Sequence, residues 1–266
     1  MTMKSFETGS GWADRVKVPV VITIYFWIIK ILATTVGETA ADFLSVNLHL
    51  GLANTTWLMS GLLVIVLGTQ LTVRRYIPWL YWAAVVFVSI VGTLITDNLT
   101  DQLNVPLEAS TAVFAVALAA AFLLWYASEK TLSIHSIFTP RREVFYWVAI
   151  LLTFALGTAG GDLVAERFDW GYALSALIFG MAILLVVVAY YSLRADAVLA
   201  FWIAYILTRP FGASCGDWLA KPADFGGLGL GTVATSAVFL AAIFGLVVYL
   251  TKTSKDVLLT TPSTKE

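Results

Sequence analysis

Residues 26–42 read FWIIKILATTVGETAAD, and three later stretches of the chain repeat the same skeleton without a gap. All four stretches follow one pattern: Phe or Tyr, then Trp, nine residues, Gly, four residues and Asp. The aspartates lie 55, 65 and 55 residues apart, so each copy has room for two membrane-spanning helices and a turn. The later stretches are YWAAVVFVSIVGTLITD at 81–97, YWVAILLTFALGTAGGD at 146–162 and FWIAYILTRPFGASCGD at 201–217.

The composition is typical of a polytopic membrane protein. Hydrophobic residues make up 59% of the 266 residues and charged residues only 12%, whereas charged residues are about a quarter of a soluble domain. Because every repeat contains two spans, all four repeats have the same orientation. We therefore predict an all-α membrane protein in which eight transmembrane helices form four parallel, pseudo-repeated helical hairpins around a polar centre. The expected spans are residues 18–44, 53–73, 78–97, 106–127, 144–163, 171–192, 197–218 and 229–251.

These spans leave no room for a soluble domain. The N-terminal stretch is polar and lacks the apolar core and cleavage site of a signal peptide, so we expect the first span to stay in the mature protein. The single cysteine, Cys215, excludes an internal disulfide and a cysteine-based metal cluster. The expected parts are an N-terminal tail (1–17), repeats 1 and 2 (18–127), a connection (128–143), repeats 3 and 4 (144–251) and a C-terminal tail (252–266).

The basic residues predict the orientation. The connections that follow the first helix of each repeat hold only Arg167 and Lys221. By the positive-inside rule, both termini and the connection at 128–143 are expected to be cytoplasmic. Twelve of the 16 Lys and Arg residues support this orientation: Lys4, Arg15, Lys17, Arg74, Arg75, Lys130, Arg141, Arg142, Arg194, Lys252, Lys255 and Lys265.

The repeated aspartates are the main candidates for function. A carboxylate within a span costs about 2.5–3.5 kcal/mol on insertion scales and normally faces the bundle interior or an aqueous path. Each Asp lies 15 residues, or about 22 Å, past its Trp. The four should therefore lie at one depth, near the non-cytoplasmic face. The repeated Gly, four residues before a second small position in each motif, indicates close packing of helices. The four aspartates are Asp42, Asp97, Asp162 and Asp217.

Residues four positions away on a helix share a face with each aspartate. Glu38, Thr93 and Thr158 stand four before, and the accessory acids Asp101 and Glu166 stand four after. Such a lining of carboxylates and hydroxyls suits Mg²⁺, Ca²⁺ or Mn²⁺ better than zinc or copper. We therefore expect these residues to bind an ion or carry protons, with the four motif aspartates as the metal ligands.

Two cations, Lys30 and Arg209, also fall inside predicted spans. Seven carboxylates against these two cations would give a cluster of charge −5, so either several carboxyls are protonated or a cation fills the site. Two roles are open for Lys30 and Arg209. They could be counter-ions that stabilise the bundle, or fixed charges that close the inner half of a cation path. Pro210 should kink or break its helix because it removes a helical hydrogen bond.

Four motifs resemble a family of bacterial multi-pass proteins described as membrane-anchored proteins. They are TTVGETAADFL, GTLITDNLTD, GTAGGDLVAE and TRPFGASCGDWL, and the resemblance covers residues from about 17 to 252. It implies a multi-pass fold in the bacterial inner membrane and assigns no substrate.

Three functions fit the sequence. The first is a transporter of a small cation, foremost Mn²⁺, Mg²⁺ or Ca²⁺, which could be coupled to protons. Such a protein is not an enzyme and binds no cofactor tightly. Its expected partners are the lipid bilayer and the cation, and we expect no nucleic acid. The second is an intramembrane aspartyl protease, in which one carboxyl acts as acid and another as base. Such enzymes resemble a Gly-x-Gly-Asp pattern, but Ala159 and Ser214 occupy the first Gly position here. The third is a scaffold or sensor that transports nothing, and the sequence leaves the oligomeric state open.

The topology has a direct test. Reporter fusions at residue 135 and at residue 222 should report opposite sides of the membrane, with residue 135 in the cytoplasm, because these residues lie in connections of opposite parity. Two fusions on the same side would contradict the arrangement of eight spans in four hairpins.

Overall fold

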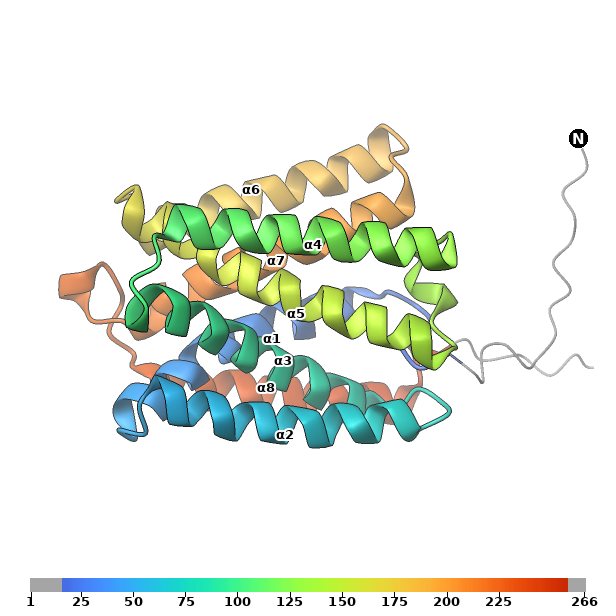
Figure 1. Ribbon diagram of the computed structural model, residues 1–266, viewed down its shortest axis with the longest axis horizontal. Helices are drawn as coiled ribbons and strands as arrows, with labels where there is room; N and C mark the ends of the chain where they lie inside the picture. Colours follow the sequence, from blue (N-terminus) through green and yellow to red (C-terminus); the bar gives the residue numbers. More distant parts are fainter. Residues whose placement is uncertain (1–15, 258–266) are drawn as a thin grey trace, which may run out of the picture.

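The computed structural model describes residues 16–257 and is all-helical over this range (Figure 1). Each of its eight α-helices is long and apolar enough to cross a membrane, which confirms the predicted fold class. The helices are α1 (Ile24–Asp42), α2 (Leu52–Thr72), α3 (Pro78–Asp97), α4 (Leu107–Glu129), α5 (Pro140–Asp162), α6 (Gly171–Ser192), α7 (Ala197–Ala220) and α8 (Thr232–Thr253).

The four odd-numbered helices form the centre of the bundle. Helix α1 packs against α3 and α7, and α5 packs against the same two helices, so the four close into a ring. The even helices lie outside: α2 packs on α3, α4 on α5, α6 on α7, and α8 on α1. Each even helix therefore packs chiefly on the odd helix of the following repeat, and the last repeat closes on the first. This cyclic exchange couples all four repeats into one bundle.

Burial differs sharply between the two sets of helices. Between 50% and 72% of the most apolar window of each odd helix is buried, but only 11–22% for the even helices. The even helices thus leave most of their apolar surface exposed, as expected for helices that face lipid.

The aromatic residues that open the motifs form a girdle around the ring. Each Phe or Tyr contacts the Trp of its own repeat and the Trp of the next one. This pattern fixes the first turns of the odd helices against each other, because aromatic pairs at these separations add to the energy of burial. The four contacts between repeats, by ring-centroid distance, are Phe26–Trp82 at 5.3 Å, Tyr81–Trp147 at 5.7 Å, Tyr146–Trp202 at 6.2 Å and Phe201–Trp27 at 5.7 Å.

The motif glycines allow the odd helices to approach closely. A Cβ atom built on any of them would overlap a side chain of the next repeat, always from the position eight residues before that repeat's Asp. The interpretation of the glycines as close-packing positions is confirmed. The four pairs are Gly37 with Ser89, Gly92 with Phe154, Gly157 with Arg209, and Gly212 with Thr34.

Residues 16–23 do not continue α1, which begins at Ile24 instead of residue 18. Pro19 disfavours a helix at the residue before it, and the backbone N–H groups of Val20 and Val21 donate to the carbonyl of Asp256, each at 3.1 Å. The described chain therefore begins and ends at the same end of the bundle. Helix α5, in contrast, begins earlier than the predicted residue 144, at Pro140, where the Thr139 hydroxyl caps it by accepting from the backbone of Arg142 at 3.3 Å.

The end that holds residues 16–23 is called the basic end below, because it carries Lys130 and Arg194 in connections and Arg141 and Arg142 in the first turn of α5. The opposite end, where the motif aspartates lie, is called the acidic end. At the basic end, Lys17 Nζ donates to Glu143 Oε2 at 2.7 Å, and both residues are buried. Burial raises the pKa of the Asp256 carboxyl, which accepts a hydrogen bond from the Tyr76 hydroxyl at 2.7 Å. Three other residues on which the orientation depends, Lys4, Arg15 and Lys265, lie outside the described residues.

The close packing can be tested at Gly37. Replacing Gly37 by Ala forces a methyl group into Ser89, and overpacking of this kind costs about 1–3 kcal/mol. Gly61 on α2 has open space around its Cα, so Gly61→Ala is the matched control and should be neutral or stabilising by about 0.5–1 kcal/mol. Thermal unfolding of both variants in detergent measures the difference. Equal melting temperatures would contradict the tight contact between α1 and α3.

Candidate functional site

The centre of the ring is occupied by Arg209 of α7, whose side chain is fully buried. Its Nη1 donates to the carbonyl of Thr34 at 2.9 Å, and its Nη2 donates to Glu38 Oε2 at 2.9 Å. The same Nη2 donates to the hydroxyls of Thr158, at 2.7 Å, and of Thr93. One guanidinium from the fourth repeat is therefore bonded to α1, α3 and α5 at once.

The repeat explains how these groups meet. Glu38, Thr93 and Thr158 occupy the same motif position, four before the Asp, and the fourth repeat has Ala213 there. Ala213 cannot accept a hydrogen bond, and Arg209 one turn earlier on α7 supplies the long side chain that reaches the other three. Gly157 on α5 leaves the space that the first carbons of Arg209 fill. The structure thus brings Glu38, Thr93 and Thr158 together, and all three accept hydrogen bonds from one arginine.

On the acidic side of this arginine lies a polar cavity of about 140 Å³. Six of the seven predicted carboxyls line it, so the accessory acids share one space with the motif aspartates. The other lining residues are Ser45, Val46, Leu52 and Lys221. The six acids are Glu38, Asp42, Asp97, Asp101, Asp162 and Glu166.

Asp217, the seventh acid, does not line this cavity. It is buried, and its Oδ1 lies 3.6 Å from Lys221 Nζ, one turn further along the chain. Lys221 also lies 3.4 Å from Glu166 Oε1 and donates to the Tyr172 hydroxyl at 2.9 Å. The sequence did not predict this role, although Lys221 occupies the motif position of Asp101 and Glu166. With Lys221 added, seven carboxylates face three cations and the formal charge is 3 − 7, or −4.

The helices change form where they reach this cavity. In α1, α3 and α5 the residue after the motif aspartate begins a π-helical turn: η2 (Phe43–Asn47), η3 (Asn98–Gln102) and η5 (Leu163–Arg167). Asp101 and Glu166 lie within these turns. Such wider turns are rare and often occur at functional sites. Helix α7 instead continues to Ala220 without one.

Lys30 lies on the basic side of Arg209. Its side chain is fully buried, and its Nζ lies 4.2 Å from the ring centroids of both Phe154 and Tyr205. Within residues 16–257 this nitrogen has no hydrogen-bond partner. Its contacts are thus cation–π contacts. Going toward the basic end, the next layer is the aromatic girdle, where the hydroxyls of Tyr81 and Tyr146 are 2.6 Å apart.

Two expectations need correction. Pro210 does not break α7, which is continuous from Ala197 to Ala220, because the proline ring packs against Gly157 and Gly161 of α5. In addition, the part of the chain that the structure describes contains no group of three or more His, Cys, Asp or Glu side chains arranged to hold a metal ion. The expected metal ligands Asp42, Asp97, Asp162 and Asp217 are therefore not arranged as a ligand set in this structure, and their role in binding a metal stays a prediction.

A comparison with family models gives four consecutive matches to one repeat. The model is described as Repeat of Unknown Function (DUF347), and it matches residues 25–76, 80–131, 145–196 and 200–256. The chain belongs to the DUF347 repeat family. Each DUF347 repeat holds one odd helix, its motif aspartate and the following even helix, which confirms the fourfold internal repetition. No curated protein and no solved structure gives a significant match.

Arg209 is the residue of the DUF347 ring that should tolerate substitution least. Arg209→Gln removes the charge that pairs with Glu38 and the donor to Thr34, Thr93 and Thr158, and breaking a buried pair in this way costs about 3–5 kcal/mol. Arg194→Gln, at an exposed position of the basic end, is the matched control and should change stability by less than about 0.5 kcal/mol. Unfolding in detergent followed by tryptophan fluorescence measures both. A loss below about 1 kcal/mol for Arg209→Gln would contradict the pairing.

Proposed function

We propose that this DUF347 protein is a transporter of a small cation, with Mn²⁺, Mg²⁺ and Ca²⁺ as the first candidates. The observation that carries the proposal is that six carboxyls from three repeats line one cavity that stops at Arg209. We also propose that the protein lies in a bacterial inner membrane with the basic end in the cytoplasm. The acidic cavity then opens on the outer side.

The charge of the cavity supports a cation as its ligand. The folded ring keeps a formal excess of carboxylates over Lys30, Arg209 and Lys221, and uncompensated charge within a membrane protein is costly. Protons or a bound cation would remove this excess. Exchange between the two gives a proton-coupled carrier. Because a hard cation takes six or more oxygen ligands, we propose that binding draws the cavity carboxylates inward from the arrangement described here.

The inner half of the bundle supports a carrier over an open channel. Between the cavity and the basic end stand the Arg209 cluster, the buried Lys30 and the aromatic girdle. Two fixed cations and a ring of large side chains would repel and block a cation at this depth. We propose that the Arg209–Glu38 pair parts when the helices move and that this opens the inner half.

The two alternatives explain fewer observations. A cavity of about 140 Å³ is smaller than the ~300–1,000 Å³ of ordinary small-molecule sites, and a protease must hold a peptide segment. A scaffold or sensor would not require six carboxyls in one space. The cavity size and its lining therefore favour a small ion.

Ion flux into proteoliposomes tests the proposal. Wild type should carry at least one of Mn²⁺, Mg²⁺, Ca²⁺ and Na⁺. Asp97→Asn and Asp162→Asn should lower that flux by about tenfold or more, equivalent to about 1.4 kcal/mol. Both variants should melt no lower than wild type, because each removes one of several like charges. Asp224→Asn, at an exposed acid outside the cavity, is the matched control and should carry ions like wild type.

The alternatives predict different results. A structural role for the aspartates predicts lower melting temperatures in the Asn variants with an unaltered ion response. No flux and no ion-dependent rise in the melting temperature of wild type, for any of the four ions, would contradict the transporter proposal.

A further inference from the structure

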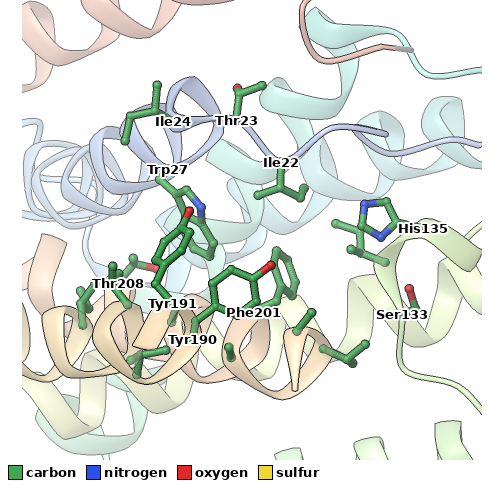
Figure 2. A pocket seen from close by; sticks show the side chains of 18 of the residues that line it. Ile22, Thr23, Ile24, Trp27, Ser133, His135, Tyr190, Tyr191, Phe201 and Thr208 are labelled. Carbon is green, nitrogen blue, oxygen red and sulfur yellow. The ribbon is translucent and has the colours of Figure 1, made fainter. Parts of the chain in front are cut away.

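A second and larger cavity lies on the outside of the ring, away from the carboxyls (Figure 2). It is a groove of about 680 Å³ between α1, α6 and α7, bordered at one end by the connection between α4 and α5. Most of its surface is apolar. Its walls include Trp27 and Ile31 of α1, Ile183 and Val187 of α6, and Ala204 of α7.

One end of the groove carries polar side chains. Ser133 and His135 lie together there, opposite the end that holds Thr208 (Figure 2). This is the basic end of the bundle. Lys130 lies three residues before Ser133, and Arg194 follows Tyr190 and Tyr191 of the groove at the end of α6; both basic residues are exposed. The groove is thus amphipathic, with positive charge beside its polar end.

The length of the groove matches one leaflet of a bilayer. Along α7 the lining runs from Ala197 to Thr208, 11 positions further on, which is about 16 Å of helix. The hydrocarbon core of a membrane is about 30 Å thick, so half of it is about 15 Å. The groove starts at the basic end and stops near the middle of the bundle, as an acyl chain of a single leaflet would.

We propose that the groove binds one acyl chain of an anionic phospholipid, whose headgroup meets Lys130 and Arg194. Helix α6 belongs to the outer, exposed set, so the open side of the groove meets the bilayer, and phospholipid is the apolar chain present there. Basic residues at a membrane surface attract anionic headgroups. The anionic lipid of the cytoplasmic leaflet is therefore the occupant that fits both the walls and the charge.

The bound chain would stabilise the joint between the last repeat and the first. Thr208 lines the groove, and its carbonyl accepts a hydrogen bond from the Thr34 hydroxyl of α1 at 3.3 Å. The next residue along the chain is Arg209. The lipid would thus support the α1–α7 contact from outside while Arg209 fixes it from inside. This inference does not depend on what the acidic cavity carries.

The test compares melting temperatures of delipidated protein in detergent with added phosphatidylglycerol or phosphatidylcholine. Phosphatidylglycerol should raise the melting temperature of wild type by about 5 °C or more near saturation, and phosphatidylcholine by less. Val187→Trp fills the groove and should abolish both shifts. Val188→Trp is the matched control, because Val188 is similarly exposed (47% against 42%) but does not line the groove.

Two further variants separate the headgroup from the chain and guard against misfolding. Lys130→Gln with Arg194→Gln should make the two lipids equivalent, whereas Arg74→Gln with Arg75→Gln should keep the preference for phosphatidylglycerol. Ile183→Trp fills the same groove if Val187→Trp fails to fold. Equal shifts for Val187→Trp and Val188→Trp, equal shifts for both lipids in wild type, or no shift with either lipid would overturn the proposal.

Discussion

The pairing of one buried guanidinium constrains the rest of this structure. An arginine at this depth needs a partner for its charge, since an unpaired charge in a low-dielectric interior is very costly. The two terminal nitrogens of Arg209 donate to the carboxylate of Glu38, the carbonyl of Thr34 and two threonine hydroxyls, so α1, α3 and α5 must all approach α7. Its Nε has no hydrogen-bond partner within residues 16–257. The motif glycines make that approach possible because they remove the side chains that would hold the helices apart.

The same arginine divides the bundle into two chemically different halves. Toward the acidic end the inner face presents carboxyls, a cavity and the π-helical turns. Toward the basic end it presents Lys30 between two aromatic rings and then the girdle of Phe, Tyr and Trp. The proposed cation site lies in the first half, whereas the second half holds the buried charge of Lys30. The repeats are therefore alike in backbone and different in the residues that determine this polarity, since only the fourth carries Arg209 and only the first carries Lys30 and Glu38.

The sequence predicted the eight helices, the fourfold repeat and the grouping of Glu38, Thr93 and Thr158, because these follow from spacing within a helix. It could not predict that each even helix packs on the next repeat, since their uniformly apolar surfaces carry no directional signal. The start of α1 could not be predicted either. Val18, Val20 and Val21 are apolar enough for a span, but the backbone N–H groups of Val20 and Val21 donate to the carbonyl of Asp256, which lies far along the chain. The reach of Arg209 across three helices and the pairing of Lys221 with Asp217 depend on tertiary distances, which one sequence does not contain.

Arg209 and Glu38 stabilise the ring as a pair, and a double-mutant cycle measures their coupling directly. The free energy of unfolding would be determined for wild type, Arg209→Gln, Glu38→Gln and the double variant under identical detergent conditions. If the pair holds the ring together, each single variant leaves the other residue of the pair without its partner. The double variant should then lose less free energy of unfolding than the sum of the two single losses, by about 1 kcal/mol or more. Additive losses would show that the two residues act independently and would contradict the account.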